Sequence, residues 1–427
     1  MNKLGTTLAL SLLLGLVGCA TDGGDDAPPP GPSEDPGPDA PPPPGPKVGG
    51  WRTASRDASH SYRSDVAGPA PSASMTVFYQ HPSAEEFAGV SSPLIDEQGN
   101  LYLTRNTPGQ PTELFSLSPS GSQRWAVSVG QSYLHHLTLG PDGHLYAIDE
   151  SGPTDARVTK LVSFDTATGA ARGAPVTVAD LTQFTMAVDG TIYLQTWSEN
   201  AGYGLQSLPS IDAAPTWTKS AAGWQFALSP AGDQLVMTID DETNNTAPLQ
   251  VAAIDPATGA DRWTTQLGAT ATGSPTLAID ADGTIYVAAS QNGSNLTIYR
   301  LGASGAVQWG SVIESLTWPS RILIGSSTVT IAAQFGAAYV GAGVALTKTA
   351  GQLPADFEMP CGEPKAIDAN DHVYWGCDGG VQVATTSGAP ITGWEGRYSA
   401  QIVLGPDGSA YHVPAAYFAD HQLFRIK

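Results

Sequence analysis

The chain has 427 residues, with 19 Lys and Arg against 40 Asp and Glu, which gives a formal net charge of −21. This balance argues against nucleic acid as a partner, because nucleic-acid binding needs clustered Lys and Arg. It also argues against a basic contact with anionic lipid head groups. The 48 Gly and 34 Pro favour many turns, as in an array of short strands.

Residues 1–18 are predicted to be a signal peptide. Lys3 supplies its basic start, and the apolar run 4–17 is too short to span a bilayer comfortably. The segment ends in Leu-Val-Gly-Cys at 16–19, which resembles the lipobox of bacterial lipoproteins. That resemblance implies cleavage before Cys19 and lipidation of Cys19, because two or three acyl chains anchor a protein stably where one does not. The alternative is an ordinary cleaved signal with an incidental cysteine.

Residues 19–50 hold Cys19 and a tether with eleven Pro and six carboxylates. No large apolar residue occurs before Val48, so the tether cannot build a core, and we expect a disordered spacer of ~3 Å per residue. Alternatively, the tether is a ligand for a partner domain that recognises Pro-rich segments. The residue after Cys19 is Ala20, whereas lipoproteins retained in the inner membrane resemble one another in an Asp at this position. The resemblance therefore implies the outer membrane.

Residues 51–427 are expected to form one domain of repeats, of which Gly273–Trp309 is the clearest copy. Apolar residues alternate over 274–280, an Asp-Gly turn follows at 282–283, and residues 284–290 are β-branched and aromatic. The unit reads as four short strands joined by three turns. Four strands alone leave two uncovered sheet faces, so such a unit needs neighbours.

The second strand of this repeat recurs eight times, 37 to 50 residues apart, at residues 102, 146, 193, 236, 286, 330, 374 and 411. The period predicts an all-β fold, an eight-bladed β-propeller of four-stranded antiparallel blades. The sixth repeat is degenerate, and the last reaches Lys427 after three strands. Met75–Gln80 reads as a lone strand, so we expect it to complete the last blade and close the ring, which would otherwise expose its edges.

The fourth repeat carries Ala253, Asp255, Thr258, Gly259 and Trp263 at the spacings of the tryptophan-docking motif of quinoprotein-like (PQQ-type) repeats. The resemblance covers about residues 51–427. It implies that each indole wedges against the next blade while the turn glycine lets the backbone pass. The blade-packing tryptophans that it implies are Trp125, Trp217, Trp263, Trp309 and Trp394. In the second repeat, a glycine at 173 replaces the tryptophan.

A second resemblance to these propellers lies in the entry segment, where Trp51 is followed by Arg56, Asp57 and His60. Asp57 and His60 invite a catalytic interpretation. We interpret them instead as residues that tie down a loop crossing the propeller face.

The quinone enzymes of this family resemble one another in a vicinal cysteine pair and in a calcium site of carboxylates and an amide. Cys361 and Cys377 are not adjacent, and no matching acidic set is present, so we expect no cofactor, no metal and no catalytic residue. These cysteines flank the first two strands of the seventh repeat, which predicts a disulfide worth ~3 kcal/mol in an exported protein. His135 and His136 are expected on opposite faces of a strand and therefore not to chelate one ion.

We therefore expect a lipid-anchored, non-enzymatic protein of the cell envelope, whose monomeric propeller binds an unknown envelope protein. Two alternatives stay open: an enzyme, either quinone-dependent or a lyase or hydrolase, and a surface protein that binds carbohydrate or peptide. Any function is expected in the parts that differ between blades, chiefly the loops around 150–158, 198–204, 240–248 and 291–295.

Overall fold

The computed structural model describes most of the predicted repeat region. The described residues are 52–53, 57–82, 89–130, 133–152, 157–198, 202–223, 225–239, 248–270, 274–291, 294–335, 340–396, 399–414 and 422–427. The predicted signal peptide, Cys19 and the tether lie outside this part of the chain, as do Trp51 and Arg56. Within the described residues no helix is long and apolar enough to cross a membrane.

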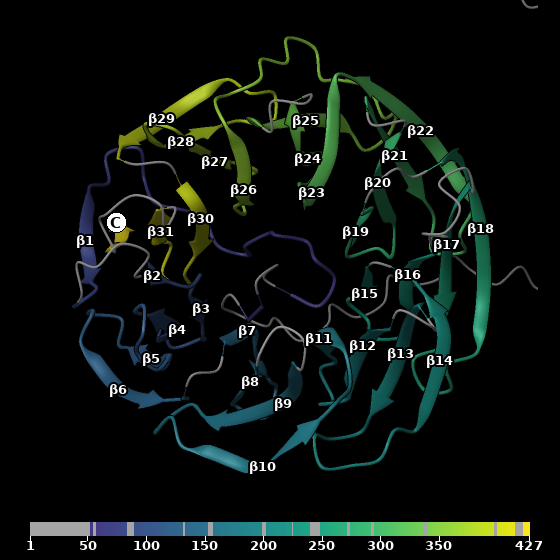
Figure 1. The fold of residues 1–427 in the computed structure, drawn as a ribbon. Helices are drawn as coiled ribbons and strands as arrows, with labels where there is room; N and C mark the ends of the chain where they lie inside the picture. Colours follow the sequence, from purple (N-terminus) through teal and green to yellow (C-terminus); the bar gives the residue numbers. More distant parts are fainter. Residues whose placement is uncertain are drawn as a thin grey trace, which may run out of the picture. The chain divides into compact units, whose positions relative to one another are not determined.

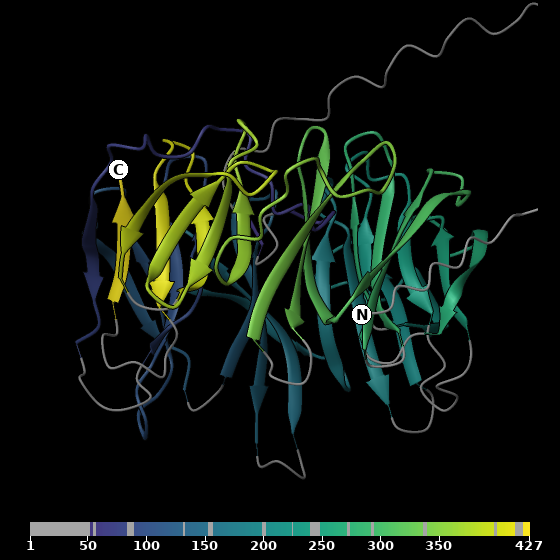
Figure 2. The ribbon, with the colours of Figure 1, turned by 90° about the horizontal axis from the view of Figure 1, so that it is seen from above.

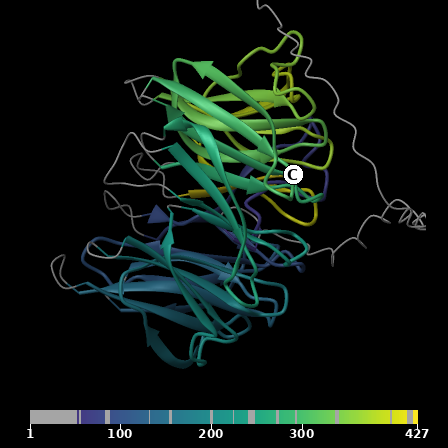
Figure 3. The same cartoon turned by 90° about the vertical axis from the view of Figure 1, so that its right-hand side faces the viewer.

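The strands form eight antiparallel sheets in a ring, an eight-bladed β-propeller (Figure 1), and Figure 3 shows the same sheets from the side. Blades one to four contain β2 (Gly89–Val90), β3 (Leu94–Ile95), β4 (Leu101–Asn106), β5 (Glu113–Leu117) and β6 (Gln123–Ser128); β7 (Tyr133–Leu139), β8 (His144–Ser151), β9 (Val158–Asp165) and β10 (Ala171–Thr177); β11 (Leu181–Met186), β12 (Ile192–Ser198), β13 (Gly202–Leu208) and β14 (Trp217–Ala222); and β15 (Phe226–Leu228), β16 (Leu235–Ile239), β17 (Pro248–Ile254) and β18 (Asp261–Thr270).

Blades five to eight contain β19 (Thr276–Ile279), β20 (Ile285–Gln291), β21 (Asn295–Leu301) and β22 (Val307–Glu314); β23 (Leu316–Ile324), β24 (Thr328–Phe335) and β25 (Val340–Thr347); β26 (Glu363–Ile367), β27 (Val373–Cys377), β28 (Gly380–Ala384) and β29 (Pro390–Glu395); and β30 (Ser399–Leu404), β31 (Ala410–Pro414), β32 (Gln422–Ile426) and β1 (Met75–Gln80). The eight predicted second-strand positions each fall in the second strand of a blade, so the predicted blade count is confirmed.

The hydrophobic core lies between blades rather than inside them. One cluster joins Val251 of blade four to Ile285 and Val287 of blade five, and all three side chains are fully buried. The outer strand β22 instead alternates exposed and half-buried residues along its length. Because each sheet buries both faces only through its neighbours, a single blade cannot be stable alone.

The N-terminal strand closes the ring, as predicted. Strand β1 pairs antiparallel with β32, with Met75 opposite Ile426, and the pairing continues into two reciprocal backbone hydrogen bonds of 3.2 Å between Ser74 and Lys427. Figure 1 shows the C-terminus beside β1. On the far side of this blade, the Phe78 ring packs onto Gly121 of blade one. Blade eight therefore has a phenylalanine where other blades have a docking tryptophan.

The five expected tryptophans all lie at contacts between neighbouring blades. Each indole Nε1 donates to a backbone carbonyl of the next blade: Trp125 to Thr166 (2.9 Å), Trp217 to Pro256 (2.8 Å), Trp263 to Ala303 (3.0 Å), Trp309 to Lys348 (2.8 Å) and Trp394 to Ala73 (2.8 Å). At the contact between blades two and three, where Gly173 replaces the tryptophan, Ile211 packs against the shared cluster instead. Trp394 reaches the residues just before β1 and so links blade seven to the closing strand.

Blade six has three described strands, not four. After β25, residues 348–362 form no strand. Gly351 in this segment still receives the Trp309 indole, and the Glu358 amide donates to the Ser387 carbonyl of blade seven over 3.0 Å. The irregular segment therefore bridges blades five and seven where a regular outer strand is missing.

The turn glycines allow a direct test of this packing. Gly305 has a φ of +82°, and a Cβ there would lie 2.5 Å from the Trp263 ring, whereas Gly143 has a φ of +76° and nothing within 4 Å. We expect Gly143→Ala to lower the free energy of unfolding by about 1 kcal/mol through backbone strain alone. Gly305→Ala adds overpacking, for a total of about 2–4 kcal/mol. Urea unfolding measures both, and equal losses would contradict the docking role of Gly305.

Candidate functional site

The two faces of the ring differ in their connections. The turns between first and second strands and between third and fourth strands are short and lie on one face, which we call the tight-turn face (Figure 2). The opposite face carries the connections between second and third strands and those from a fourth strand to the next blade, whose lengths vary from one residue between β22 and β23 to eight between β16 and β17. The variable loops expected to hold the function belong to that face, and most of their residues lie outside the described part of the chain.

Residues 52–53 and 57–64, which we call the strap, cross the centre of the tight-turn face (Figure 1). The last residue of the inner strand in five different blades donates its backbone N–H to a strap carbonyl. These bonds run from Leu139 to Arg52 (2.8 Å), Leu228 to Ala58 (3.0 Å), Ile279 to Ser59 (2.9 Å), Ile324 to Ser61 (3.1 Å) and Ile367 to Tyr62 (3.1 Å). The strap therefore lies over the central channel and ties the blades together.

Asp57 and His60 hold the strap in shape. Oδ1 of Asp57 accepts hydrogen bonds from Ser59 Oγ (2.8 Å) and from the Ser61 backbone N–H (3.0 Å). His60 has a φ of +60°, and burial lowers its pKa, although Asp57 and a hydrogen bond to the Leu277 carbonyl oppose the shift. Both residues stabilise the strap where it crosses the propeller face, which agrees with the interpretation of the sequence.

His135 and His136 do not lie on opposite faces of their strand, so that expectation is wrong. A β-bulge between His135 and Thr138, with His136 at a φ of +51°, breaks the alternation and brings the two rings to 5.0 Å between centroids. Desolvation, then the nearby His135 and His60, lower the pKa of His136. No group of three or more His, Cys, Asp or Glu side chains among the described residues is placed to hold a metal ion.

A further histidine predicts a pH-dependent stability. His412 on β31 is fully buried, neither ring nitrogen has a hydrogen-bond partner among the described residues, and burial lowers its pKa to about 4. Because the unfolded chain binds a proton near pH 6.5, stability is complete above that pH and is lost as the pH falls towards 4. We expect His412→Leu to remove about 2–3 kcal/mol of the decline between pH 7 and 4.5, measured by urea unfolding. An unchanged decline would refute this assignment.

A pocket opens between blades three and four on the tight-turn face, with a volume of ≈ 330 Å³. Asp189, Asp233 and Asp255 line it, and Arg262 neutralises one of them through a 2.9 Å ion pair with Asp255. Burial, then the charges of Asp189 and Asp255, raise the pKa of the lining Tyr193 to about 12. The pocket is therefore electronegative and suits a cationic group. The sequence alone did not predict it, because Asp189 lies in a turn of blade three whereas Asp233 and Asp255 lie in turns of blade four.

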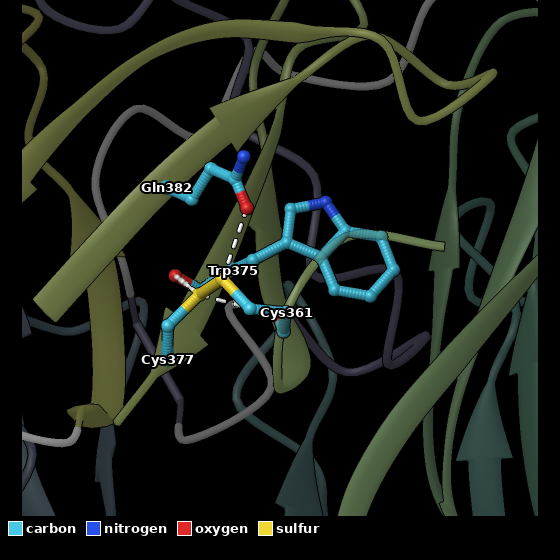
Figure 4. Close-up of a disulfide and its surroundings, with 4 residues drawn as sticks. All are labelled: Cys361, Trp375, Cys377 and Gln382. Atoms are coloured by element: carbon cyan, nitrogen blue, oxygen red, sulfur yellow. Dashed lines mark hydrogen bonds between the residues drawn. A yellow bond between two sulfur atoms is a disulfide. The ribbon is translucent and has the colours of Figure 1, made fainter. Parts of the chain in front are cut away.

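The two cysteines of blade seven are joined in a disulfide, with their Cα atoms 5.4 Å apart (Figure 4). Cys361 lies near the end of the irregular segment that follows β25 of blade six, and Cys377 ends β27. Cys361 Sγ also lies 2.9 Å from Oε1 of Gln382 on β28. The bond thus holds the irregular segment against blade seven.

Comparisons with protein-family models and with curated proteins give no match. Among solved structures, BamB from Moraxella catarrhalis is similar, with a TM-score of 0.54, 16% identity, and coverage of 83% of this chain and 98% of that one. A quinohemoprotein alcohol dehydrogenase from Pseudomonas putida HK5 is similar with a TM-score of 0.61, 12% identity and coverage of 88% and 80%. The chain shares the β-propeller fold of these proteins. A europium-containing methanol dehydrogenase is also similar, with a TM-score of 0.56, 10% identity and coverage of 85% of this chain and 89% of that one.

Proposed function

We propose that this protein is a lipoprotein of the cell envelope whose PQQ-type propeller binds a protein partner and catalyses no reaction. The similarity to BamB, which extends over 98% of that chain, supports a scaffold role. The lipobox-like residues up to Cys19 support a lipid anchor and, with Ala20, the outer membrane. A binding role also suits the repeats, because their most conspicuous residues, the docking tryptophans, are occupied in blade packing.

The observation that carries the proposal is the electronegative pocket between blades three and four. It is large enough for a single side chain, and its carboxylates Asp189 and Asp233 have no ion-pair partner among the described residues. Val188, which directly precedes the lining residue Asp189 in the chain, is 52% exposed and offers an apolar side chain beside it. A Lys or Arg side chain of a partner, with an apolar neighbour, fits this combination.

Photo-crosslinking in the native envelope tests the scaffold role. A photoreactive residue at Val188 is expected to capture a protein partner identifiable by mass spectrometry, and Asp189→Asn with Asp233→Asn is expected to reduce its yield. A photoreactive residue at Val312, which is 55% exposed on β22 of blade five, is the matched control. Identical products from both positions, or none from Val188, would reject the pocket as the binding site.

The anchor is tested separately by Cys19→Ala. We expect this variant to leave the membrane fraction, and wild-type protein to sediment with the outer membrane. A variant that stays membrane-bound would reject lipidation of Cys19 as the anchor.

A quinone-dependent dehydrogenase is the second candidate, since two of the similar structures are quinone or methanol-oxidising enzymes by name. The described residues do not fit the quinone site that the family resemblance implies. Cys361 and Cys377 are 16 positions apart and form a disulfide at blade seven, so they are not a vicinal pair. Dye reduction on addition of quinone, calcium and an alcohol, with a rise in thermal stability, would decide for the enzyme and against the scaffold.

A further inference from the structure

Three charged side chains of blades six and seven form a buried cluster. Glu363 accepts a 2.6 Å hydrogen bond from Lys365 Nζ at Oε2, and its Oε1 lies 3.3 Å from Nε of Arg321. Oε1 also accepts from Ser320 Oγ at 2.6 Å. The side chains of Arg321, Glu363 and Lys365 are only 11%, 14% and 3% exposed.

The cluster faces the central channel. Nη1 of Arg321, on the inner strand of blade six, donates over 3.2 Å to Oε1 of Gln401, on the inner strand of blade eight. Because blade seven separates these two blades everywhere except at the axis, this bond must run through the channel. The Tyr62 ring of the strap lies 5.3 Å from the Arg321 guanidinium and covers the cluster from the tight-turn side.

A β-bulge brings Lys365 to this position. The pairing of β26 with β27 shifts between Pro364 and Ala366, so Lys365 is the extra residue and has no partner across the ladder. Bulges re-aim a side chain at the cost of regular pairing, and they are common beside binding sites. A similar shift in β23, between Thr317 and Arg321, lies beside the second cation.

The charges in the cluster do not balance. Two cations share one carboxylate, and the surplus positive charge is buried in a protein whose net charge is −21. Among the described residues, one of the three Lys365 Nζ protons has an acceptor, Glu363, and Nε of Arg321 is buried without a hydrogen bond. Burial, then the charge of Arg321, lower the pKa of Lys365 to about 8, although Glu363 opposes the shift. A buried charge without a counterion is costly, so the site favours an added anion.

We propose that Arg321 and Lys365 bind a small oxyanion, either a carboxylate or a phosphate group, in the central channel. The anion accepts hydrogen bonds from the free Nζ protons of Lys365 and balances the surplus charge. The site is independent of the pocket between blades three and four, and hence of the proposed scaffold role.

Isothermal titration of the folded chain with sodium acetate and with inorganic phosphate, at constant ionic strength set with chloride, tests the proposal at pH 7. At least one of the two anions is expected to bind. Lys365→Met is expected to weaken that binding at least tenfold, because it removes the charge and keeps most of the side chain's length. Glu363→Gln is expected to tighten it severalfold, because it removes the competing carboxylate. Lys427→Met, at a lysine whose side chain is 60% exposed, is the matched control and is expected to bind like wild type.

A second measurement needs no variant. Affinity of the wild-type protein is expected to fall several-fold between pH 7 and 9, as Lys365 loses its proton. Absence of binding by both anions, or binding that is unchanged by Lys365→Met and by pH, would overturn the proposal. Binding that Lys427→Met weakens as much as Lys365→Met would also overturn it.

Discussion

Replacing Met75–Gln80 with six Gly and Ser residues is expected to abolish cooperative unfolding of the propeller. The replacement keeps the chain connected but removes the strand that pairs with β32 and the Phe78 ring that packs on Gly121. The faces with which blades one and eight pack against each other are then uncovered, and each blade exposes an apolar face. The loss is comparable with the whole stability of a domain, roughly 5–15 kcal/mol.

The same replacement in β10 is the matched control. Strand β10 is also the outermost strand of its blade, but it follows its neighbour β9 in sequence, and six of its seven residues are exposed. The β10 replacement is expected to retain a cooperative unfolding transition in urea, as monitored by tryptophan fluorescence and circular dichroism. If the β1 replacement unfolds as cooperatively as the β10 replacement, the ring does not depend on its N-terminal strand.

Trp394→Ala is expected to lower the free energy of unfolding by about 3–5 kcal/mol, the usual cost of deleting a buried aromatic side chain. Trp394 is 9% exposed, and its Nε1 donates to the Ala73 carbonyl just before β1 over 2.8 Å. The substitution therefore leaves both a cavity and an unsatisfied carbonyl at the contact between blades seven and eight.

Trp197→Ala is the control, since Trp197 on β12 is 38% exposed. Its loss is expected to be well below that of Trp394→Ala in urea unfolding at pH 7. Trp394→Phe is expected to recover part of the loss, because the ring returns while the N–H does not. A Trp394→Ala protein as stable as Trp197→Ala would contradict the docking of blade seven onto the closing strand.

The blades were predictable because their determinants are local. The Asp-Gly turn and alternating strands of Gly273–Trp309 specify a hairpin from within a few residues, and repetition at 37 to 50 residues then fixes the number of blades. Closure by Met75–Gln80 was predictable because the last repeat has three strands and Met75–Gln80 is a lone strand that can supply the fourth. The packing of each docking indole against the next blade was implied by the resemblance to quinoprotein-like repeats.

The channel was not predictable, because its features depend on contacts between distant segments. His136 and Lys365 sit at bulges, where the alternation used to assign strand faces fails. The bond from Arg321 to Gln401 joins residues 80 positions apart and exists only once the ring is closed. The pocket near Asp189 likewise combines turns of two blades, and no single repeat contains it.

The pairing of β1 with β32 also determines the order in which the protein can fold. The Thr76 hydroxyl and the Arg425 carbonyl, 3.4 Å apart in this pairing, are separated by 349 positions in the chain. Contacts so distant in sequence form late, because ordering the intervening chain costs entropy before they form. Because β1 precedes every other strand in the chain, we expect it to remain unpaired during synthesis until β32 is complete. The propeller reaches its final stability only when β32 arrives.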